Sequence, residues 1–143
     1  MTRYLLDTNI LSEAIKPTPS VTLLDWMADQ RDADLYIATF SLAELRRGIL
    51  QLPAGRKRTE LEAWFAGPEG PSNLFRGRIL TFDEAAAAVW AELMAAGQLQ
   101  GRPRSALDMI IAATARANGC VVASGNERHF TGVVDHLNPM QPV

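Results

Sequence analysis

The stretch that decides the fold is YLLDTNILSE, residues 4 to 13. Its apolar start, Tyr4-Leu5-Leu6, is typical of a short buried strand, and a helical pattern over residues 10–15 follows almost directly. Between the two stands Asp7, a carboxylate at the point where a core strand ends. Two explanations are open, because Asp7 can cap the next helix or hold a cation.

The composition is that of one globular domain, which we place at residues 1–143, with 48% hydrophobic and 21% charged residues. A net charge of -2 gives no overall attraction to nucleic acid, so such a role requires local basic patches. The lone Cys120 cannot form an internal disulfide, and the sequence contains no signal peptide or membrane-spanning run. These features predict a soluble, cytoplasmic protein.

Short apolar runs alternate with helical patterns along the rest of the chain. We expect strands at 5–7, 35–38, 79–80, 120–123 and within 132–137. The predicted N-caps of the helices are Ser20, Ser41, Thr81 and Ser105, and GPEGPSN at 67–73 is predicted to be a loop. Apolar strands separated by helices indicate an α/β fold, with a central parallel sheet covered on both faces.

Four polar residues lie where ligands gather in such folds, beyond the carboxyl ends of the strands. Asp7 follows the first strand, and Asn126 follows the strand at 120–123. Glu44 is expected in the first turn of the helix after the second strand. Asp108 is expected in the first turn of the helix before residue 120. The four side chains are therefore predicted to converge at one rim of the sheet.

Helix capping is the alternative explanation for two of these acids. The segments 41–44 and 105–108 both match the capping box, in which a first-turn acid satisfies free backbone amides. The segment 81–84 matches it equally well without any candidate function. The pattern alone therefore does not separate capping from catalysis. Asn9 likewise has an alternative explanation as a turn residue.

Asp108 lies in an almost wholly apolar helix, which predicts that its carboxylate is buried. Burying an unpaired carboxylate costs several kcal/mol. If Asp7 or Glu44 lies about 4 Å away, repulsion adds about 4 kcal/mol at an effective dielectric near 20. A divalent cation reverses the sign of that term, and Mg²⁺ or Mn²⁺ suits oxygen ligands. The cysteine and the two histidines lack zinc-ligand spacing.

Four stretches in this order resemble one known family. They are LLDTN at 5–9, SLAELRRG at 41–48, ALDMIIAATA at 106–115 and ASGNERHF at 123–130. Together they resemble PIN-domain proteins of the VapC type, the toxin halves of bacterial toxin–antitoxin pairs. The resemblance implies a PIN-like α/β/α sandwich with a central parallel sheet. It also implies an endoribonuclease that depends on Mg²⁺, which Mn²⁺ can replace.

By this resemblance the catalytic residues are Asp7, Glu44, Asp108 and Asn126. The first three form the metal site, and we expect Asp7 and Asp108 to be direct ligands. One departure concerns residues 124–126, which read Ser-Gly-Asn here but often Thr-Arg-Asn or Thr-Arg-Asp in relatives. The neutral Asn126 leaves the number of metal ions, one or two, open.

The resemblance also implies partners. These are a cognate VapB-like antitoxin whose C-terminal segment covers the acidic pocket, an RNA substrate, and a second copy of the chain in a homodimer. Promoter DNA is expected to be contacted only through the antitoxin, and no membrane is involved. Basic clusters at Arg46-Arg47, at residues 56–58 and at Arg102 and Arg104 either hold flanking phosphates or form solvated surfaces.

Two other functions remain open from the residues. The first is a catalytically weakened PIN domain that acts as an antitoxin- and RNA-binding regulatory module, which the neutral Asn126 would allow. The second is a phosphoacceptor or phosphatase-like protein with Asp7 as nucleophile. Against the second, no acid stands two residues after Asp7, and the chain has only two lysines, Lys16 and Lys57.

Overall fold

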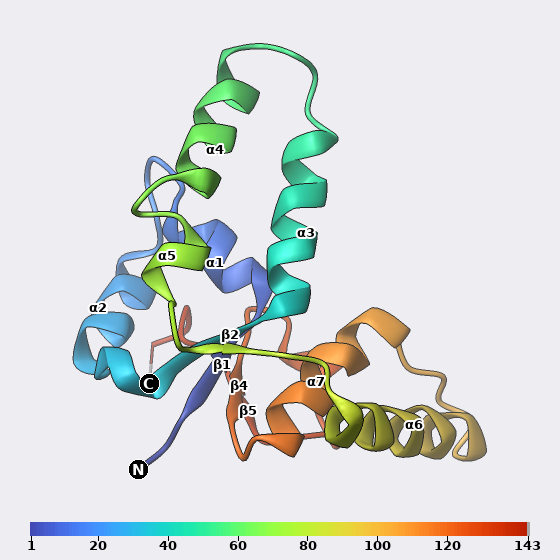
Figure 1. Cartoon of the computed structure of the whole chain (residues 1–143). Helices are drawn as coiled ribbons and strands as arrows, with labels where there is room; N and C mark the ends of the chain where they lie inside the picture. The colour runs from blue at the N-terminus through green and yellow to red at the C-terminus, as the bar shows by residue number, and fades with distance from the viewer. Residues whose placement is uncertain (143) are drawn as a thin grey trace.

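The computed structural model of the chain describes residues 1–142. Within them, five parallel strands form one sheet in the order β3-β2-β1-β4-β5 (Figure 1). The strands are β1 Tyr4–Leu6, β2 Leu35–Ala38, β3 Ile79–Leu80, β4 Val121–Ala123 and β5 His136–Leu137. The α-helices are α1 Thr8–Ala14, α2 Val21–Asp29, α3 Thr39–Leu50, α4 Arg56–Ala66, α5 Pro71–Leu74, α6 Glu84–Leu99 and α7 Ala106–Ala117. The 3₁₀ turns are η1 Asp32–Asp34 and η2 Glu127–His129. The predicted α/β fold with a parallel sheet is confirmed.

The central strand β1 shows why helices cover both faces of the sheet. Leu5 and Leu6 are both fully buried, and successive side chains of a strand point to opposite faces. Leu5 packs with apolar residues of α6 and α7, and Leu6 packs with those of α1, α2 and α3. Each such burial contributes about 1.5–3 kcal/mol. The helices thus form two outer layers, as the predicted α/β/α sandwich requires (Figure 1).

Two helices begin at residues other than those predicted. Helix α3 begins at Thr39, because β2 leads into it without a loop, so the predicted cap Ser41 lies buried inside the helix. Its N-cap is Ala38, which has no capping side chain. Helix α6 is capped by Asp83 rather than by Thr81. Glu44 consequently lies beyond the first turn of α3, so its predicted position in that turn is wrong, and so is the alternative explanation that it caps the helix.

Other predicted boundaries shift by a few residues. The first strand ends at Leu6, and the last strand covers only two residues of the predicted 132–137. Part of the predicted loop at 67–73 is the short helix α5, which begins with Pro71. The caps Ser20 and Ser105 are confirmed, since each side chain accepts a backbone amide at 3.2 Å.

The single domain expected at residues 1–143 stays a prediction, and its last residue lies outside the described part of the chain. Among the helices of residues 1–142, none is long and apolar enough to cross a membrane.

Candidate active site

The four predicted site residues come together at the carboxyl ends of the strands. Asp7 follows β1, Asn126 lies between β4 and η2, Glu44 projects from α3, and Asp108 lies in the first turn of α7. All four line one cavity of about 430 Å³, which we call the acidic cavity. The other residues lining it are Thr8, Asn9, Ser12, Glu13, Lys16 and Met140.

Asp7 is fixed by three hydrogen bonds. The residue is 7% exposed. Its Oδ1 accepts the amide of Thr8 at 2.8 Å, so Asp7 does cap α1. Its Oδ2 accepts hydrogen bonds from the hydroxyl of Ser124 at 2.9 Å and from the side-chain amide of Asn9 at 3.2 Å. The capping explanation is therefore correct for one oxygen, while the other is tied to the loop that carries Asn126.

The surroundings of Asp7 disfavour its ionised form. Burial is the main cause that raises the pKa of Asp7, and the charges of Glu44 and Asp108 raise it further. Hydrogen bonds from Ser124 and Thr8 lower the pKa and offset only part of this. A bound cation favours ionisation and would relieve this cost.

Glu44 is held by the hydroxyl of Thr8, which in turn contacts the hydroxyl of Ser41. The Thr8 hydroxyl donates to Oε1 of Glu44 at 2.6 Å and lies 3.0 Å from the hydroxyl of Ser41. Because a hydroxyl carries one proton, Thr8 donates to Glu44 and accepts from Ser41. The second oxygen, Oε2, lies 4.0 Å from Nη2 of Arg47. The available signals were the position of Thr8 beside Asp7 and of Ser41 one helical turn before Glu44.

The prediction that Asp108 is buried is wrong, since its side chain is 29% exposed. Burial in α7 starts at Met109, whereas the first turn of this helix opens onto the acidic cavity. Half of the predicted capping box forms, because Ser105 accepts the amide of Asp108. Nδ1 of His129 lies 2.9 Å from Oδ2 of Asp108 but is not aligned for a hydrogen bond. This contact fixes Asp108 less firmly than Asp7 is fixed.

The loop after β4 is tied to helix α1. The amide of Asn126 donates to the Ser124 hydroxyl at 2.9 Å, and the amide of Gly125 donates to Oδ1 of Asn9 at 3.0 Å. Asn9 is therefore more than a turn residue. A Cβ atom on Gly125 would overlap the terminal methyl group of Met140, which forms part of the cavity wall. Met140 thus occupies the space that a side chain at position 125 would need.

The donor atoms suit a hydrated hard cation better than a caged metal ion. Among residues 1–142, no three His, Cys, Asp or Glu side chains converge closely enough to form a ready-made metal cage. The carboxylates around the cavity nevertheless provide oxygen donors, and Mg²⁺ commonly binds through one or two carboxylates while keeping several waters. The residues therefore fit Mg²⁺, whereas nothing here matches a zinc site.

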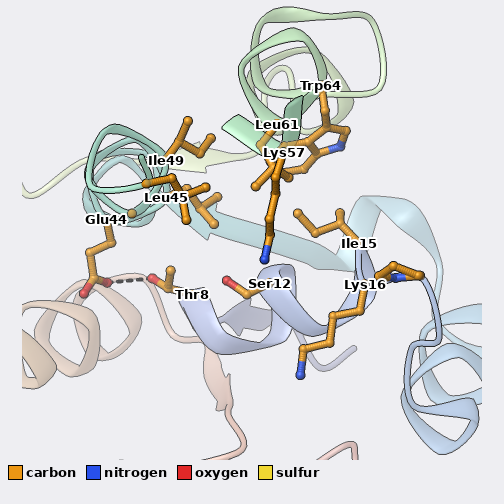
Figure 2. A pocket seen from close by; sticks show the side chains of 13 residues that line it. Thr8, Ser12, Ile15, Lys16, Glu44, Leu45, Ile49, Lys57, Leu61 and Trp64 are labelled. Carbon is orange, nitrogen blue, oxygen red and sulfur yellow. Dashed lines mark hydrogen bonds between the residues drawn. The ribbon is translucent and has the colours of Figure 1, made fainter. Parts of the chain in front are cut away.

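An apolar groove of about 350 Å³ adjoins the acidic cavity between α1, α3 and α4. The groove and the cavity share Thr8, Ser12, Lys16 and Glu44. Figure 2 shows Leu45 and Ile49 from α3 facing Leu61 and Trp64 from α4, with Ile15 nearby. In the same view Lys57 extends from α4 toward α1, and the bond from Thr8 to Glu44 marks the edge of the groove (Figure 2).

Comparisons with known proteins show the family to which the chain belongs. The PIN domain family matches residues 4–134. The chain is 37% identical over 138 residues to VapC ribonuclease Y4jK of Sinorhizobium fredii, which covers 96% of this chain and 97% of the relative. It is 36% identical to Toxin FitB of Neisseria gonorrhoeae over 88% of this chain and 89% of the relative. The solved structure of FitAB bound to an IR36 DNA fragment superposes with a TM-score of 0.86 at 33% identity, covering 98% and 97% of the two chains.

The chain belongs to the PIN-domain family. Within that family it is a toxin of the VapC and FitB type, in the class of PIN-domain nucleases.

Proposed function

We propose that this toxin is a Mg²⁺-dependent endoribonuclease that hydrolyses RNA phosphodiester bonds in the acidic cavity. The observation that carries the proposal is the meeting of Asp7, Glu44, Asp108 and Asn126 around one cavity at the carboxyl ends of the strands. The relative named VapC ribonuclease supports the reaction class. The cytoplasm, where RNA is made and used, is the proposed place of action.

Each residue has a distinct part in this mechanism. Asp7 and Asp108 would hold the Mg²⁺ ion. When bound, this ion, or Mn²⁺ in its place, supplies a water of lowered pKa and positive charge for the phosphoryl oxygens. Glu44 accepts the Thr8 hydroxyl at Oε1, and its Oε2 lies 4.0 Å from Nη2 of Arg47, which is too long for a hydrogen bond. Oε2 can therefore accept a hydrogen bond from the attacking water and orient it. Asn126 completes the rim with a neutral amide.

The metal requirement is tested with purified protein and an unstructured labelled RNA. We expect cleavage in Mg²⁺ or Mn²⁺, none in EDTA, and recovery when Mg²⁺ is added back. An Asp7→Asn variant purified in the same way controls for contaminating ribonuclease. Equal cleavage in EDTA would contradict the mechanism. RNA binding without any cleavage would instead favour the alternative of a weakened, binding-only PIN domain.

We also propose that a VapB-like antitoxin covers the acidic cavity. The similar structure of FitAB bound to an IR36 DNA fragment supports a partner of this kind and contact with DNA through that partner. A basic side chain of the partner would lie among Asp7, Glu44 and Asp108. Because the cavity and the apolar groove share lining residues, one extended segment can occupy both. The homodimer expected from the resemblance stays a prediction.

This partner site is tested with the antitoxin encoded beside the toxin. Deleting the antitoxin's C-terminal segment should abolish inhibition, and inhibition that survives the deletion would contradict the proposal. In the toxin, Leu61→Asp should weaken inhibition because it places a charge in the groove. Ala63→Asp, an exposed position of the same helix, is the matched control and should leave inhibition unchanged.

A further inference from the structure

The basic clusters of the sequence differ in how far carboxylates neutralise them. The two clusters on α3 and α4 lie among glutamates. Their ion pairs are Arg46–Glu62 at 3.9 Å, Arg47–Glu44 at 4.0 Å, Arg56–Glu60 at 3.0 Å and Arg58–Glu62 at 2.7 Å. Binding a phosphate at these arginines would compete with an existing partner, which reduces the gain.

The third cluster is not neutralised in this way. Arg102 and Arg104, joined by Arg128 from η2, line a cavity of about 660 Å³, which we call the arginine cavity. Within residues 1–142, none of these three arginines forms an ion pair. The single carboxylate in the lining is that of Asp108, whose Oδ2 lies beside His129. The wall therefore carries three permanent positive charges and one negative charge.

The arginine cavity lies directly beside the acidic cavity. The two cavities share Asp108, whereas the acidic cavity shares Thr8 and Glu44 with the apolar groove. The acidic cavity is thus flanked by an apolar groove on one side and by an arginine-lined cavity on the other. An RNA strand that crosses the acidic cavity can place its next phosphates among the arginines.

The loop that carries Arg102 and Arg104 is held in place. The amide of Arg102 donates to the carbonyl of Gly97 at 2.9 Å, and Nη1 of Arg104 donates to the carbonyl of Leu93 at 2.7 Å. A Cβ atom at position 97 would lie 2.9 Å from the carbonyl oxygen of Arg102, so the close approach requires glycine. The positive charges are therefore presented by an ordered backbone, which lowers the entropy cost of binding.

The acidic cavity by itself repels RNA, so a positively charged site beside it would favour RNA binding. Its lining contains four carboxylates, Asp7, Glu13, Glu44 and Asp108, and one ammonium, Lys16, which is paired with Glu13 at 2.9 Å. An approaching RNA phosphate is repelled by these carboxylates. Guanidinium groups bind phosphates through two parallel hydrogen bonds and can offset that repulsion.

We propose that the arginine cavity binds backbone phosphates of an unpaired RNA strand on one side of the cleaved bond, with Arg102 and Arg128 as the main contacts. This inference rests on the proposed ribonuclease function. Arg104 is already bonded to α6 and contributes charge. Because phosphates carry no sequence information, the cavity increases affinity without choosing the cleavage sequence. It therefore affects KM more than kcat.

The test compares the double variant Arg102→Gln/Arg128→Gln with a control that removes the same charge elsewhere. The control is Arg56→Gln/Arg116→Gln, in which Arg116 lies about 12 Å along α7 from Asp108. Steady-state cleavage gives KM and kcat. Fluorescence anisotropy gives RNA affinity in an Asp7→Asn background, in which the RNA is not cut. Both arginines of the test pair are exposed, and within residues 1–142 their side chains form no hydrogen bond, so folding should be unaffected.

For the test pair we expect KM to rise at least about tenfold with kcat within about twofold. The slope of log affinity against log salt should fall by about 1.4, at about 0.7 for each lost phosphate contact on a single strand. The control should change KM by less than about twofold. Equal effects of both pairs, or an unchanged KM and salt slope, would overturn the proposal. So would a loss of antitoxin binding with RNA binding intact, which would indicate a protein-docking site.

The cleavage and anisotropy measurements distinguish a failure of the arginine cavity from a failure of the proposed ribonuclease function. If the parent protein cleaves no RNA, the proposed function fails, and the anisotropy measurement still decides whether the arginine cavity binds RNA. If the parent cleaves RNA and the test pair behaves like the control, the function stands and the arginine cavity is not a subsite.

Discussion

Asp7 and Asp108 border the same cavity but are held in opposite ways. Asp7 stands at the end of the central strand, buried, with three hydrogen bonds to its carboxylate. Asp108 stands in the first turn of a helix, with a 29% exposed side chain and one unaligned contact to His129. The first carboxylate has a fixed position, whereas the second can adjust to a ligand.

This difference shows which carboxylate destabilises the metal-free protein. Burial and neighbouring charges raise the pKa of Asp7, so the metal-free protein is destabilised at the strand end. The side chain of Asp108 is 29% exposed and therefore less deeply buried than that of Asp7. A cation would therefore be attracted to a rigid, destabilised ligand, and the flexible ligand would close around it.

The largest expected effect is on catalysis. Asp7→Asn and Asp108→Asn should each lower kcat/KM for RNA by about a thousandfold, or about 4 kcal/mol, because each would remove a negatively charged ligand of the proposed metal ion. Cleavage of a labelled RNA in Mg²⁺ provides the measurement, and circular dichroism should show intact folds. If Asp108→Asn kept near-parent activity, only the strand-end carboxylate would be a ligand.

The next effect is on stabilisation by Mg²⁺. An ion that binds only the folded parent stabilises it by about 2.7 kcal/mol at a hundredfold excess over Kd. Both asparagine variants should lose most of this increment. Urea midpoints with Mg²⁺ and with EDTA measure it for the three proteins. Equal stabilisation of Asp108→Asn and the parent would show that Asp108 is not a ligand.

A smaller effect is expected from the groups that support each carboxylate. Ser124→Ala should lower activity about 10–100-fold, because groups that orient a metal ligand typically contribute this much. His129→Ala should lower it only a few-fold, since His129 is not aligned to hydrogen bond Asp108. The ratio of the two losses, measured as kcat/KM at fixed Mg²⁺, reports how unequally the carboxylates are held. Equal losses would show that Asp7 and Asp108 are held equally firmly.

The smallest effect is on stability against pH without metal. Because the folded-state pKa of Asp7 is raised, the folded protein keeps a proton that the unfolded chain loses above its ordinary pKa of about 3.9. Stability in EDTA should therefore fall as the pH rises from that value through the raised pKa. Urea midpoints across this window measure the slope. Asp7→Asn should flatten it, and an unchanged slope in this variant would show that Asp7 is not the group responsible.

The sequence predicted the parts of the site that the sheet itself positions. Asp7 and Asn126 were placed correctly at one rim, because the carboxyl ends of parallel strands share an edge. The start of α3 was misplaced, because its N-cap residue is Ala38. Alanine has no capping side chain, so no capping pattern in the sequence indicates this start. The exposure of Asp108 was misjudged, because an apolar helix does not reveal which end opens onto a cavity.

The supporting residues could not be predicted, because their roles depend on contacts between distant segments. The hydroxyl of Ser41 reaches Thr8 only once α3 packs on α1. His129 meets Asp108 only when η2 folds back on α7. Arg128 likewise joins Arg102 only in the folded chain. Local patterns of hydrophobicity and capping contain no information about such pairs.

The contact between Gly125 and Met140 should be visible in the natural variation of this group of toxins. A side chain at position 125 would displace the terminal methyl group of Met140, which is flexible enough to move at little cost in stability. The exchange would instead reshape one wall of the acidic cavity. We expect positions 125 and 140 to change together during evolution, so that a larger residue at one accompanies a smaller or differently directed residue at the other.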